Sequence, residues 1–140
     1  MLLFGGSDIR GISTSNVISI NLELKQWEIV NASIVDPQAT LSGLTPRTGA
    51  GSALCDDKLF VFGGWTRTDE KADGVAVDSF SVLDLLAMEW IVVDRPYPAH
   101  VGSLGYNLVT YAAPCFHGHK VVLTRGRIED NTVRISYIPF

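Results

Sequence analysis

The sequence of 140 residues predicts an all-β fold made of repeated antiparallel units. Short segments rich in β-branched and aromatic residues recur along the chain, and Gly, Pro, Asn or Asp residues bound each of them, as is typical of strands and turns. No segment carries a convincing helical period over the roughly 11 residues that a helix assignment needs. The segments also recur at a fixed spacing, which indicates a repeat architecture.

The repeat is visible when residues 15–27 are aligned with residues 78–90. Their apolar positions stay in register, and both segments end on tryptophan. A weaker third copy places residues 120–124 on residues 58–62. The matched pairs are Val17 with Phe80, Ile20 with Leu83, Asn21 with Asp84, Leu22 with Leu85 and Trp27 with Trp90.

One repeat unit is predicted to be a four-stranded antiparallel meander. Asp56-Asp57 makes its first short turn, and residues 85–89 connect its last two strands. The predicted strands are residues 51–55, 59–62, 79–84 and 90–93. An isolated meander cannot bury both of its faces, so we expect such units to stack on one another.

The complete unit also carries a specific pattern. Pro46-Arg47 is followed by small residues, an apolar strand then ends on Gly63-Gly64, and Trp90 follows the third strand. This pattern resembles the kelch repeat, and the resemblance implies kelch-type β-propeller blades. The sequence departs from the kelch pattern in two ways. The residue seven positions before the tryptophan, usually aromatic, is Ile20 in one copy and Leu83 in the other. The third copy has Arg125-Gly126 in place of the double glycine.

The resemblance divides the chain into three parts. Residues 1–45 are expected to form the C-terminal part of one blade with a connecting loop, residues 46–97 a complete blade, and residues 98–140 a degenerate partial blade. Propellers typically close with roughly four to eight blades. We therefore expect an incomplete propeller, which is either a piece of a larger one in a longer chain or is completed by other subunits.

Two residue types are expected to serve the blade structure. The double glycines follow the second strand, where the chain must swing outward, and glycine accepts positive φ and a close neighbouring backbone. The indole of each tryptophan is expected to fill the wedge between adjacent blades. These structural residues are Gly5, Gly6, Trp27, Gly63, Gly64 and Trp90.

The long connections are the predicted interaction face. In a meander, the loops from strand two to three and from strand four to one emerge on the same side, and recognition concentrates in loops on rigid scaffolds. These loops are residues 7–15, 31–45, 65–78 and 94–107. The candidate partner-binding residues on this face are Arg10, Arg47, Trp65, Arg67 and Tyr97.

Each candidate also has a structural interpretation. Trp and Arg are enriched among interface hot spots, yet Trp65 is equally compatible with folding back onto its own blade. Arg47 has the charge to meet a ligand carboxylate or, as the more ordinary role, to bind carbonyl groups of a neighbouring blade. Tyr97 lies between Pro96 and Pro98, a pattern that is also typical of a rigid connector.

Composition excludes several partners. The net charge of −4 gives no basic footprint for nucleic acid. No apolar run approaches the roughly 18 residues of a membrane span, so no membrane partner is expected. Two cysteines favour a reducing compartment, and we expect a cytoplasmic protein.

Catalytic patterns are not found. His117-Gly118-His119 resembles a metal pair, but it falls on the turn position of Asp56-Asp57 and has no further ligand at suitable spacing. Cys55 and Cys115 are expected to be buried, inert thiols. We predict no catalytic residue, metal or cofactor, and a non-enzymatic scaffold that presents propeller loops to a partner protein. The alternative is a fragment of a kelch-propeller enzyme, oxidase-like or specifier-like, whose catalytic blades lie outside this chain.

Overall fold

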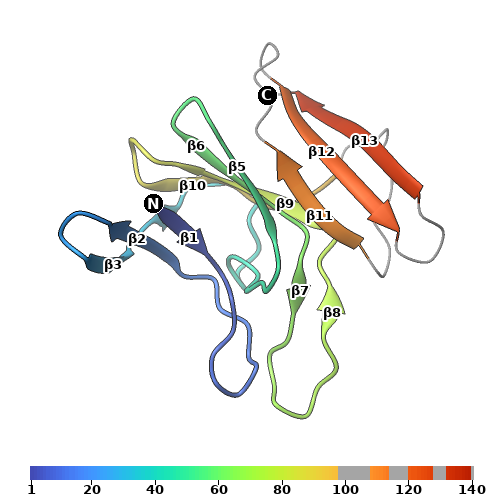
Figure 1. The fold of residues 1–140 in the computed structure, drawn as a ribbon, viewed down its shortest axis with the longest axis horizontal. Coiled ribbons are helices and arrows are strands. Elements are labelled where there is room, and N and C mark those ends of the chain that lie inside the picture. Colours follow the sequence, from blue (N-terminus) through green and yellow to red (C-terminus); the bar gives the residue numbers. More distant parts are fainter. Residues whose placement is uncertain (98–107, 114–119, 128–131, 140) are drawn as a thin grey trace.

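The computed structural model describes the backbone of residues 1–97, 108–113, 120–127 and 132–139, and the side chains of residues 1–97. Every regular element in these ranges is a β-strand, which confirms the all-β prediction (Figure 1). The described part of the chain contains no helix long and apolar enough to cross a membrane. His117, His119 and Cys115 lie outside the described residues.

Three sheets of three or more strands follow one another along the described part of the chain. The N-terminal sheet has the order β1-β2-β3, and the C-terminal sheet has the order β11-β12-β13. A larger central sheet lies between them in Figure 1, and β11 lies beside β5 of this sheet. The outer strands are β1 (Leu2–Phe4), β2 (Val17–Asn21), β3 (Gln26–Val30), β11 (Leu108–Ala113), β12 (Lys120–Arg127) and β13 (Thr132–Pro139).

The central sheet contains the predicted four-stranded antiparallel meander. Its strands are β5 (Gly51–Cys55), β6 (Lys58–Phe62), β9 (Ser79–Asp84) and β10 (Glu89–Pro96). The turn at Asp56 and Asp57 has φ values of 45° and 57°, so both residues adopt the left-handed conformation of a tight hairpin turn. The meander prediction is therefore confirmed, although β10 extends beyond the predicted strand.

Three short strands lie inside segments that were expected to be plain loops. β4 (Ser33–Ile34) pairs in parallel with the outer edge of β10, and β7 (Trp65–Thr66) pairs with β8 (Val75–Ala76) as a projecting hairpin. Downstream of β4, Asp36 accepts a hydrogen bond from the Val93 N–H at 2.8 Å. The connection 31–45 is thus fixed along the side of the central sheet before it returns to β5.

The short turns show that the first two sheets are built on one plan. The side-chain oxygen Oδ1 of Asn21 accepts two backbone N–H groups of its turn, at 3.1 and 3.0 Å. Oδ1 of Asp84 does the same in the central sheet, at 3.0 Å for both. Lys25 and Met88 close these turns with φ values of 53° and 56°. The aligned residues Asn21 and Asp84 thus stabilise equivalent turns in the two sheets.

The double glycines lie where neighbouring backbones come close. Gly5 has φ of 71° and Gly64 has φ of 88°. A Cβ on Gly5 would overlap the carbonyl oxygen of Arg47, and a Cβ on Gly64 would come within 2.9 Å of the Thr48 carbonyl oxygen. Since the neighbour of Gly5 belongs to the segment that leads into the next sheet, this glycine allows two successive units to approach each other.

Trp90 lies between the N-terminal and central sheets. Its side chain is only 4% exposed, and its ring meets Phe4 edge to face at a centroid distance of 5.7 Å. The surrounding apolar cluster includes Val17 from β2 and Leu83 from β9. This is the position between adjacent units that the sequence interpretation assigns to the tryptophan.

Trp27 differs from Trp90. Its side chain is 68% exposed on β3, because no described sheet covers that face of the N-terminal sheet. The expectation that Trp27 fills a wedge between blades is therefore not met within the described residues.

The opposite face of the central sheet carries a second apolar cluster. Ala53, Phe60, Phe62 and Val82 are buried there. The rings of Phe62 and Phe80 stack at 6.3 Å. The sheet is thus apolar on both faces, as expected for a unit that stacks between two neighbours.

Candidate functional site: the paired loops

Two of the long loops, residues 7–15 and 65–78, are joined through their backbones. The Ser13 N–H donates to the Arg67 carbonyl oxygen at 2.8 Å, and the Arg67 N–H donates to Ser13 Oγ at 3.0 Å. Ser13 is buried at this junction. The loops come from successive sheets, and they are thus held as one unit at the lower end of the molecule in Figure 1.

Thr48 strengthens this junction. Its backbone exchanges hydrogen bonds with the Trp65 backbone at 2.7 and 2.9 Å. Its hydroxyl donates to the Gly6 carbonyl oxygen at 3.0 Å and lies 3.0 Å from Ser13 Oγ. The loop bases are therefore fixed by a connected set of hydrogen bonds, which limits how far the loops move apart.

We define the paired-loop surface as Asp8, Ile9, Arg10, Trp65, Arg67, Asp69 and Glu70. Arg10 donates from Nε and Nη2 to Asp8 Oδ2 at 3.0 and 2.9 Å. Its Nε also lies 3.6 Å from Glu70 Oε1 of the other loop. Arg10 therefore adds an exposed ionic contact between the loops, of the kind that salt weakens.

Asp8 organises the tip of the first loop. Its Oδ1 accepts the backbone N–H groups of Arg10 and Ile12, at 2.9 and 3.0 Å. The hydrogen bond from the Ile12 N–H is the largest effect on the pKa of Asp8 and lowers it. Burial acts in the opposite direction, but the hydrogen bonds and charge of Arg10 add to the lowering, so the pKa lies below its ordinary value. The carboxylate thus stays ionised at neutral pH and keeps the loop turned.

Arg67 closes the tip of the β7–β8 loop. Its Nε donates to the Asp69 carbonyl oxygen at 3.1 Å, and its Nη2 donates to the Glu70 carbonyl oxygen. A Cβ on Gly11 would lie 3.0 Å from Arg67 Nη1, so the guanidinium also contacts the first loop. The side chain of Arg67 is thus used mainly to shape the surface.

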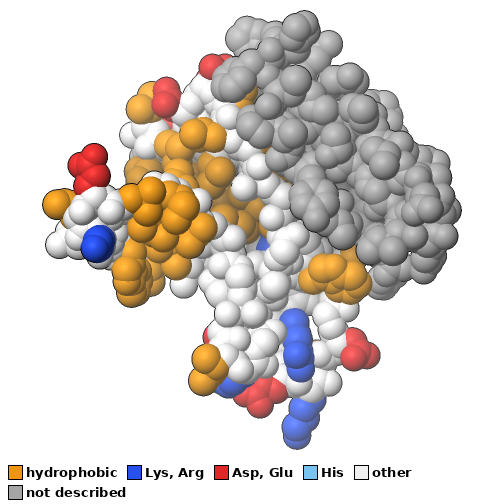
Figure 2. Space-filling view, viewed as in Figure 1, with side chains coloured by type: hydrophobic (Ala, Val, Ile, Leu, Met, Phe, Trp, Pro, Cys, Tyr) orange, Lys and Arg blue, Asp and Glu red, His pale blue; other side chains and the backbone are white. Residues whose placement is uncertain are grey.

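Exposed apolar side chains accompany these charges. Ile9 is fully exposed at the tip of its loop, and Trp65 is 37% exposed next to Gly74. Figure 2 shows Lys, Arg, Asp and Glu side chains gathered with a few hydrophobic ones on the lower part of the molecule, where these loops lie. The sequence interpretation did not single out Ile9, because an isolated apolar residue in a loop carries no pattern.

Arg47 is not part of this surface. It is completely buried, and its Nη2 donates to Asp94 Oδ1 at 2.5 Å. Its Nη1 donates to the carbonyl oxygens of Ser79 at 2.8 Å and Gly63 at 3.2 Å. The structure therefore gives Arg47 the structural role, and no contact with a partner is open to its guanidinium.

Tyr97 is also separate from the paired loops. Its ring stacks on Phe80 at 6.1 Å and packs against the apolar cluster that contains Phe62. The side chain is half-buried. Of the predicted residues, Arg10, Trp65 and Arg67 thus lie on the two paired loops, whereas Arg47 and Tyr97 lie elsewhere.

Metal-binding and thiol chemistry have little support in the described residues. No group of three or more His, Cys, Asp or Glu side chains within them is arranged to hold a metal ion. Burial raises the pKa of the half-buried Cys55 thiol, and the neighbouring Asp56 raises it further. The thiol thus stays protonated at neutral pH and is a poor nucleophile.

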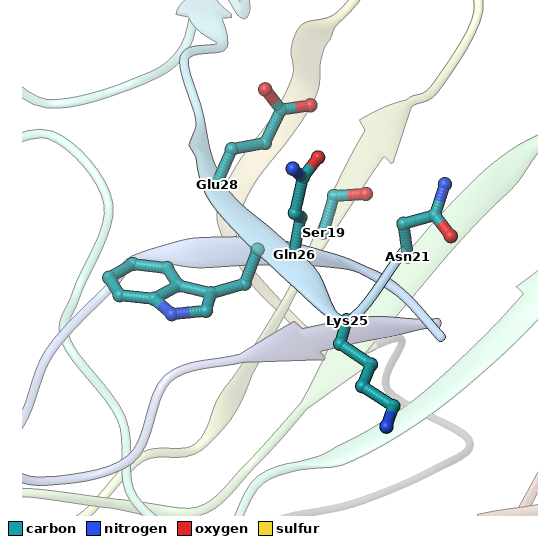
Figure 3. A pocket seen from close by; sticks show the side chains of 6 residues that line it. Ser19, Asn21, Lys25, Gln26 and Glu28 are labelled. Atoms are coloured by element: carbon teal, nitrogen blue, oxygen red, sulfur yellow. The ribbon is translucent and has the colours of Figure 1, made fainter. Parts of the chain in front are cut away.

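A shallow hollow lies at the edge of the N-terminal sheet (Figure 3). Its volume is about 510 Å³. The side chains around it do not converge, because Glu28 and Gln26 point away from Lys25 in this view. The lining residues are Ser19, Asn21, Lys25, Gln26, Trp27 and Glu28.

Comparison with known protein families gives a match over part of the chain. The family described as the Kelch motif matches residues 46–94, which include β5, β6, β9 and most of β10. No curated protein matches the chain. The match covers the unit that carries Arg47, Gly63, Gly64 and Trp90.

Proposed function

We propose that this chain, whose residues 46–94 form a kelch repeat, is a non-catalytic scaffold that binds a partner protein through its paired-loop surface. A kelch motif suggests a protein-interaction repeat domain, and the paired loops are the part of the described structure that is best arranged for such contacts. The loops project from the sheets, and loops on rigid scaffolds are where recognition concentrates.

One observation carries the proposal: Ile9 is fully exposed on a loop that is fixed to its neighbour. One backbone hydrogen bond from Ser13 to Arg67 and one from the Arg67 N–H to the Ser13 hydroxyl hold the two loops together before any partner arrives. A surface that is already ordered loses less conformational entropy on association. An apolar side chain surrounded by charged groups also matches the usual arrangement of a hydrophobic centre and a polar rim in interfaces.

The charged groups of the paired-loop surface favour selective recognition of a partner over nonspecific electrostatic attraction. Arg10 lies between Asp8 and Glu70, so basic and acidic groups alternate across the surface. A surface of mixed charge selects a partner with a complementary pattern and repels mismatched ones. We therefore expect a specific protein partner, in which an apolar pocket receives Ile9 and flanking charges meet Arg10 and Glu70.

The test is affinity capture from cell extract with the full chain and two variants, followed by quantitative mass spectrometry. Ile9→Asp removes the apolar centre, while Leu24→Asp makes the same chemical change at a turn of the N-terminal sheet, where Leu24 is 65% exposed. We expect a defined protein to bind the wild type and Leu24→Asp equally and to be lost from Ile9→Asp. Equal recovery of every bound protein from all three chains would contradict the proposal.

A further inference from the structure

The outer edge of β3 has no strand beside it among the described residues. The N-terminal sheet has the order β1-β2-β3, so β3 has one neighbour. Ile20 of β2 turns both of its backbone groups toward Met1, because its N–H donates to the Met1 carbonyl oxygen at 2.8 Å and its carbonyl oxygen accepts the Met1 amino group at 2.9 Å. Trp27 lies directly opposite Ile20. Opposed residues of an antiparallel pair exchange either two hydrogen bonds or none, so the N–H and C=O of Trp27 point to the open edge.

The corresponding edge of the central sheet carries a strand. Trp90 aligns with Trp27 in the internal repeat, and β4 lies parallel to β10 beside Trp90. The Ser33 N–H donates to the Met88 carbonyl oxygen at 3.2 Å, and the Val35 N–H donates to the Trp90 carbonyl oxygen at 3.1 Å. This edge of the repeat unit thus accepts a parallel strand as short as two residues.

The hollow in Figure 3 follows the open edge of β3. The four consecutive residues from Lys25 to Glu28 line it, together with Ser19 and Asn21 of β2. Successive side chains of a strand point to opposite faces, so a hollow lined by such a run lies along the edge of the strand and not over one face. Its side chains point in different directions, an arrangement that fits an extended chain better than a compact ligand.

The anchor that holds β4 beside β10 has no counterpart at β3. In the central sheet, both carboxylate oxygens of Asp36 accept hydrogen bonds from Arg95, at 3.1 and 3.0 Å. The residue that aligns with Arg95 in the N-terminal sheet is Ala32. A segment like residues 31–45 would therefore lack its ionic contact at the edge of β3.

Two charged residues lie at the β3 edge instead. Lys25 and Glu28 align with Met88 and Ile91 of the central sheet. Both charged side chains are exposed, and neither forms an ion pair with a described residue. The two charges are therefore available to a segment that carries the opposite charges in complementary positions.

We propose that the edge of β3 binds an extended peptide of a partner protein, which adds a parallel strand as β4 does on β10. In the register of β4, the peptide has an acidic residue near Lys25, an apolar residue opposite Trp27 and a basic residue opposite Glu28. Paired side chains of neighbouring strands share a face, so the apolar residue packs on the indole, which is 68% exposed. Backbone pairing supplies the affinity and the three side chains supply the selectivity. Other residues form the paired-loop surface, so failure of one proposal does not decide the other.

The probe is a synthetic peptide with blocked ends that copies residues 31–38 and carries Ala32→Glu and Val35→Lys. In the register of β4, its new charges meet Lys25 and Glu28, and its Ile34 lies opposite Trp27. The control peptide carries Ala32→Lys and Val35→Glu, so its net charge is the same. Amide hydrogen exchange, followed by nuclear magnetic resonance, measures the protection of the Trp27 N–H in the full chain with each peptide.

At a concentration of about ten times its dissociation constant, the matched peptide is expected to slow exchange of the Trp27 N–H about tenfold, because the edge is then free only about one-tenth of the time. We expect no change with the control peptide at the same concentration. The double variant Lys25→Glu with Glu28→Lys is expected to reverse this preference, and it keeps the net charge of the chain. The matched peptide methylated on the backbone nitrogen of its fifth residue is expected not to bind, because it lacks the N–H that meets the Trp27 carbonyl oxygen.

Four results would overturn the proposal. Unchanged exchange with the matched peptide at millimolar concentration would show that the edge accepts no such strand. Equal slowing by both peptides would show that Lys25 and Glu28 do not select the occupant, and equal slowing by the methylated peptide would exclude strand pairing. Protection of the Trp27 N–H in the free chain that is lost on dilution, as a dimer dissociates by light scattering, would identify a second copy as the occupant.

Discussion

Arg47, which is fully buried, and Asp94, which is partly exposed, form an ion pair that joins the beginning of the kelch repeat to its last strand. Arg47 Nη2 lies 2.5 Å from Asp94 Oδ1, and the Arg47 side chain has no solvent exposure. Asp94 adopts a φ of 47° where the pairing of β10 with β9 is irregular. Its second oxygen, Oδ2, accepts hydrogen bonds from the Thr45 N–H at 2.8 Å and the Thr45 hydroxyl at 2.6 Å. One carboxylate thus fixes both the guanidinium and the incoming chain.

Replacing Arg47 by Met is expected to destabilise the protein strongly. Removal of Arg47 leaves the Asp94 carboxylate without its countercharge. Breaking a fully buried pair costs about 3–5 kcal/mol, and because Asp94 is 22% exposed, its partial hydration offsets some of this cost. Urea unfolding monitored by circular dichroism measures the loss. Lys58→Met is the control, because Lys58 lies 3.9 Å from Asp84 in a partly exposed pair, and such pairs contribute about 0–1 kcal/mol. Equal losses for the two variants would contradict the assigned role of Arg47.

Gly5→Ala is expected to destabilise the protein by more than about 1 kcal/mol, because φ is 71° and the new Cβ would overlap the Arg47 carbonyl oxygen. Gly74→Ala is the matched control. Its Cβ would meet Trp65 Cε3 at 3.5 Å and the Thr66 carbonyl oxygen at 3.8 Å, which are ordinary van der Waals distances, and we expect a change within about 0.5 kcal/mol. The free energies of unfolding of the two variants, measured in urea, check this. A neutral Gly5→Ala would show that the two sheets do not depend on this close approach.

The local sequence pattern predicted the four meander strands of the central sheet. Other elements, such as β4, depend on contacts between residues that are distant in the sequence. The strand from Ser79 to Asp84 follows from its own residues and from the turn that Asp84 begins. β4 is only two residues long and pairs in parallel with β10. It depends on Asp36, which contacts Arg95 from 59 positions away in the sequence. No local pattern near Ser33 indicates such a contact.

The candidate site was predicted only in part, because some of its residues are positioned by contacts between distant parts of the sequence. Arg10 and Arg67 follow the double glycines at the start of corresponding loops, so the repeat places them on one surface. Whether Arg47 points outward or inward depends on Asp94, 47 positions later. The sequence therefore left both roles open, and only the packed structure decides between them. The exposure of Trp27 likewise depends on which sheet stacks beside it.

Asp36 makes the stability of the protein depend on pH in acid. Burial raises its pKa, but hydrogen bonds from the N–H groups of Gln38 and Val93, together with the Arg95 guanidinium, outweigh this and bring the pKa below the ordinary 3.8. Since the folded pKa is lower than the unfolded one, the contribution is complete above about pH 4 and is lost as pH falls through the folded pKa.

The measurement is urea unfolding of the wild type and Asp36→Asn between neutral pH and about pH 2, a range that spans the carboxyl pKa values. We expect the wild type to be more stable at neutral pH and the difference to shrink below about pH 4. Asp8 and Asp84 also have lowered pKa values, but both chains contain them, so their effects cancel. If the difference in free energy of unfolding between the two chains does not change with pH, the charge of Asp36 does not hold the connection 31–45 against the central sheet.

Trp27 and Trp90 occupy the same position of the repeat, yet their replacement by Ala is expected to have different effects. Trp90 is 4% exposed and contacts Phe4 across two sheets, whereas Trp27 is 68% exposed. Trp90→Ala leaves a large cavity, and such changes cost about 3–5 kcal/mol. Trp27→Ala removes mostly hydrated surface, and we expect a change within about 0.5 kcal/mol in the monomeric chain. Urea unfolding at low protein concentration measures both. If Trp27→Ala proves as costly as Trp90→Ala, the Trp27 side chain is already covered in the free chain, because only a packed indole leaves a cavity when it is removed.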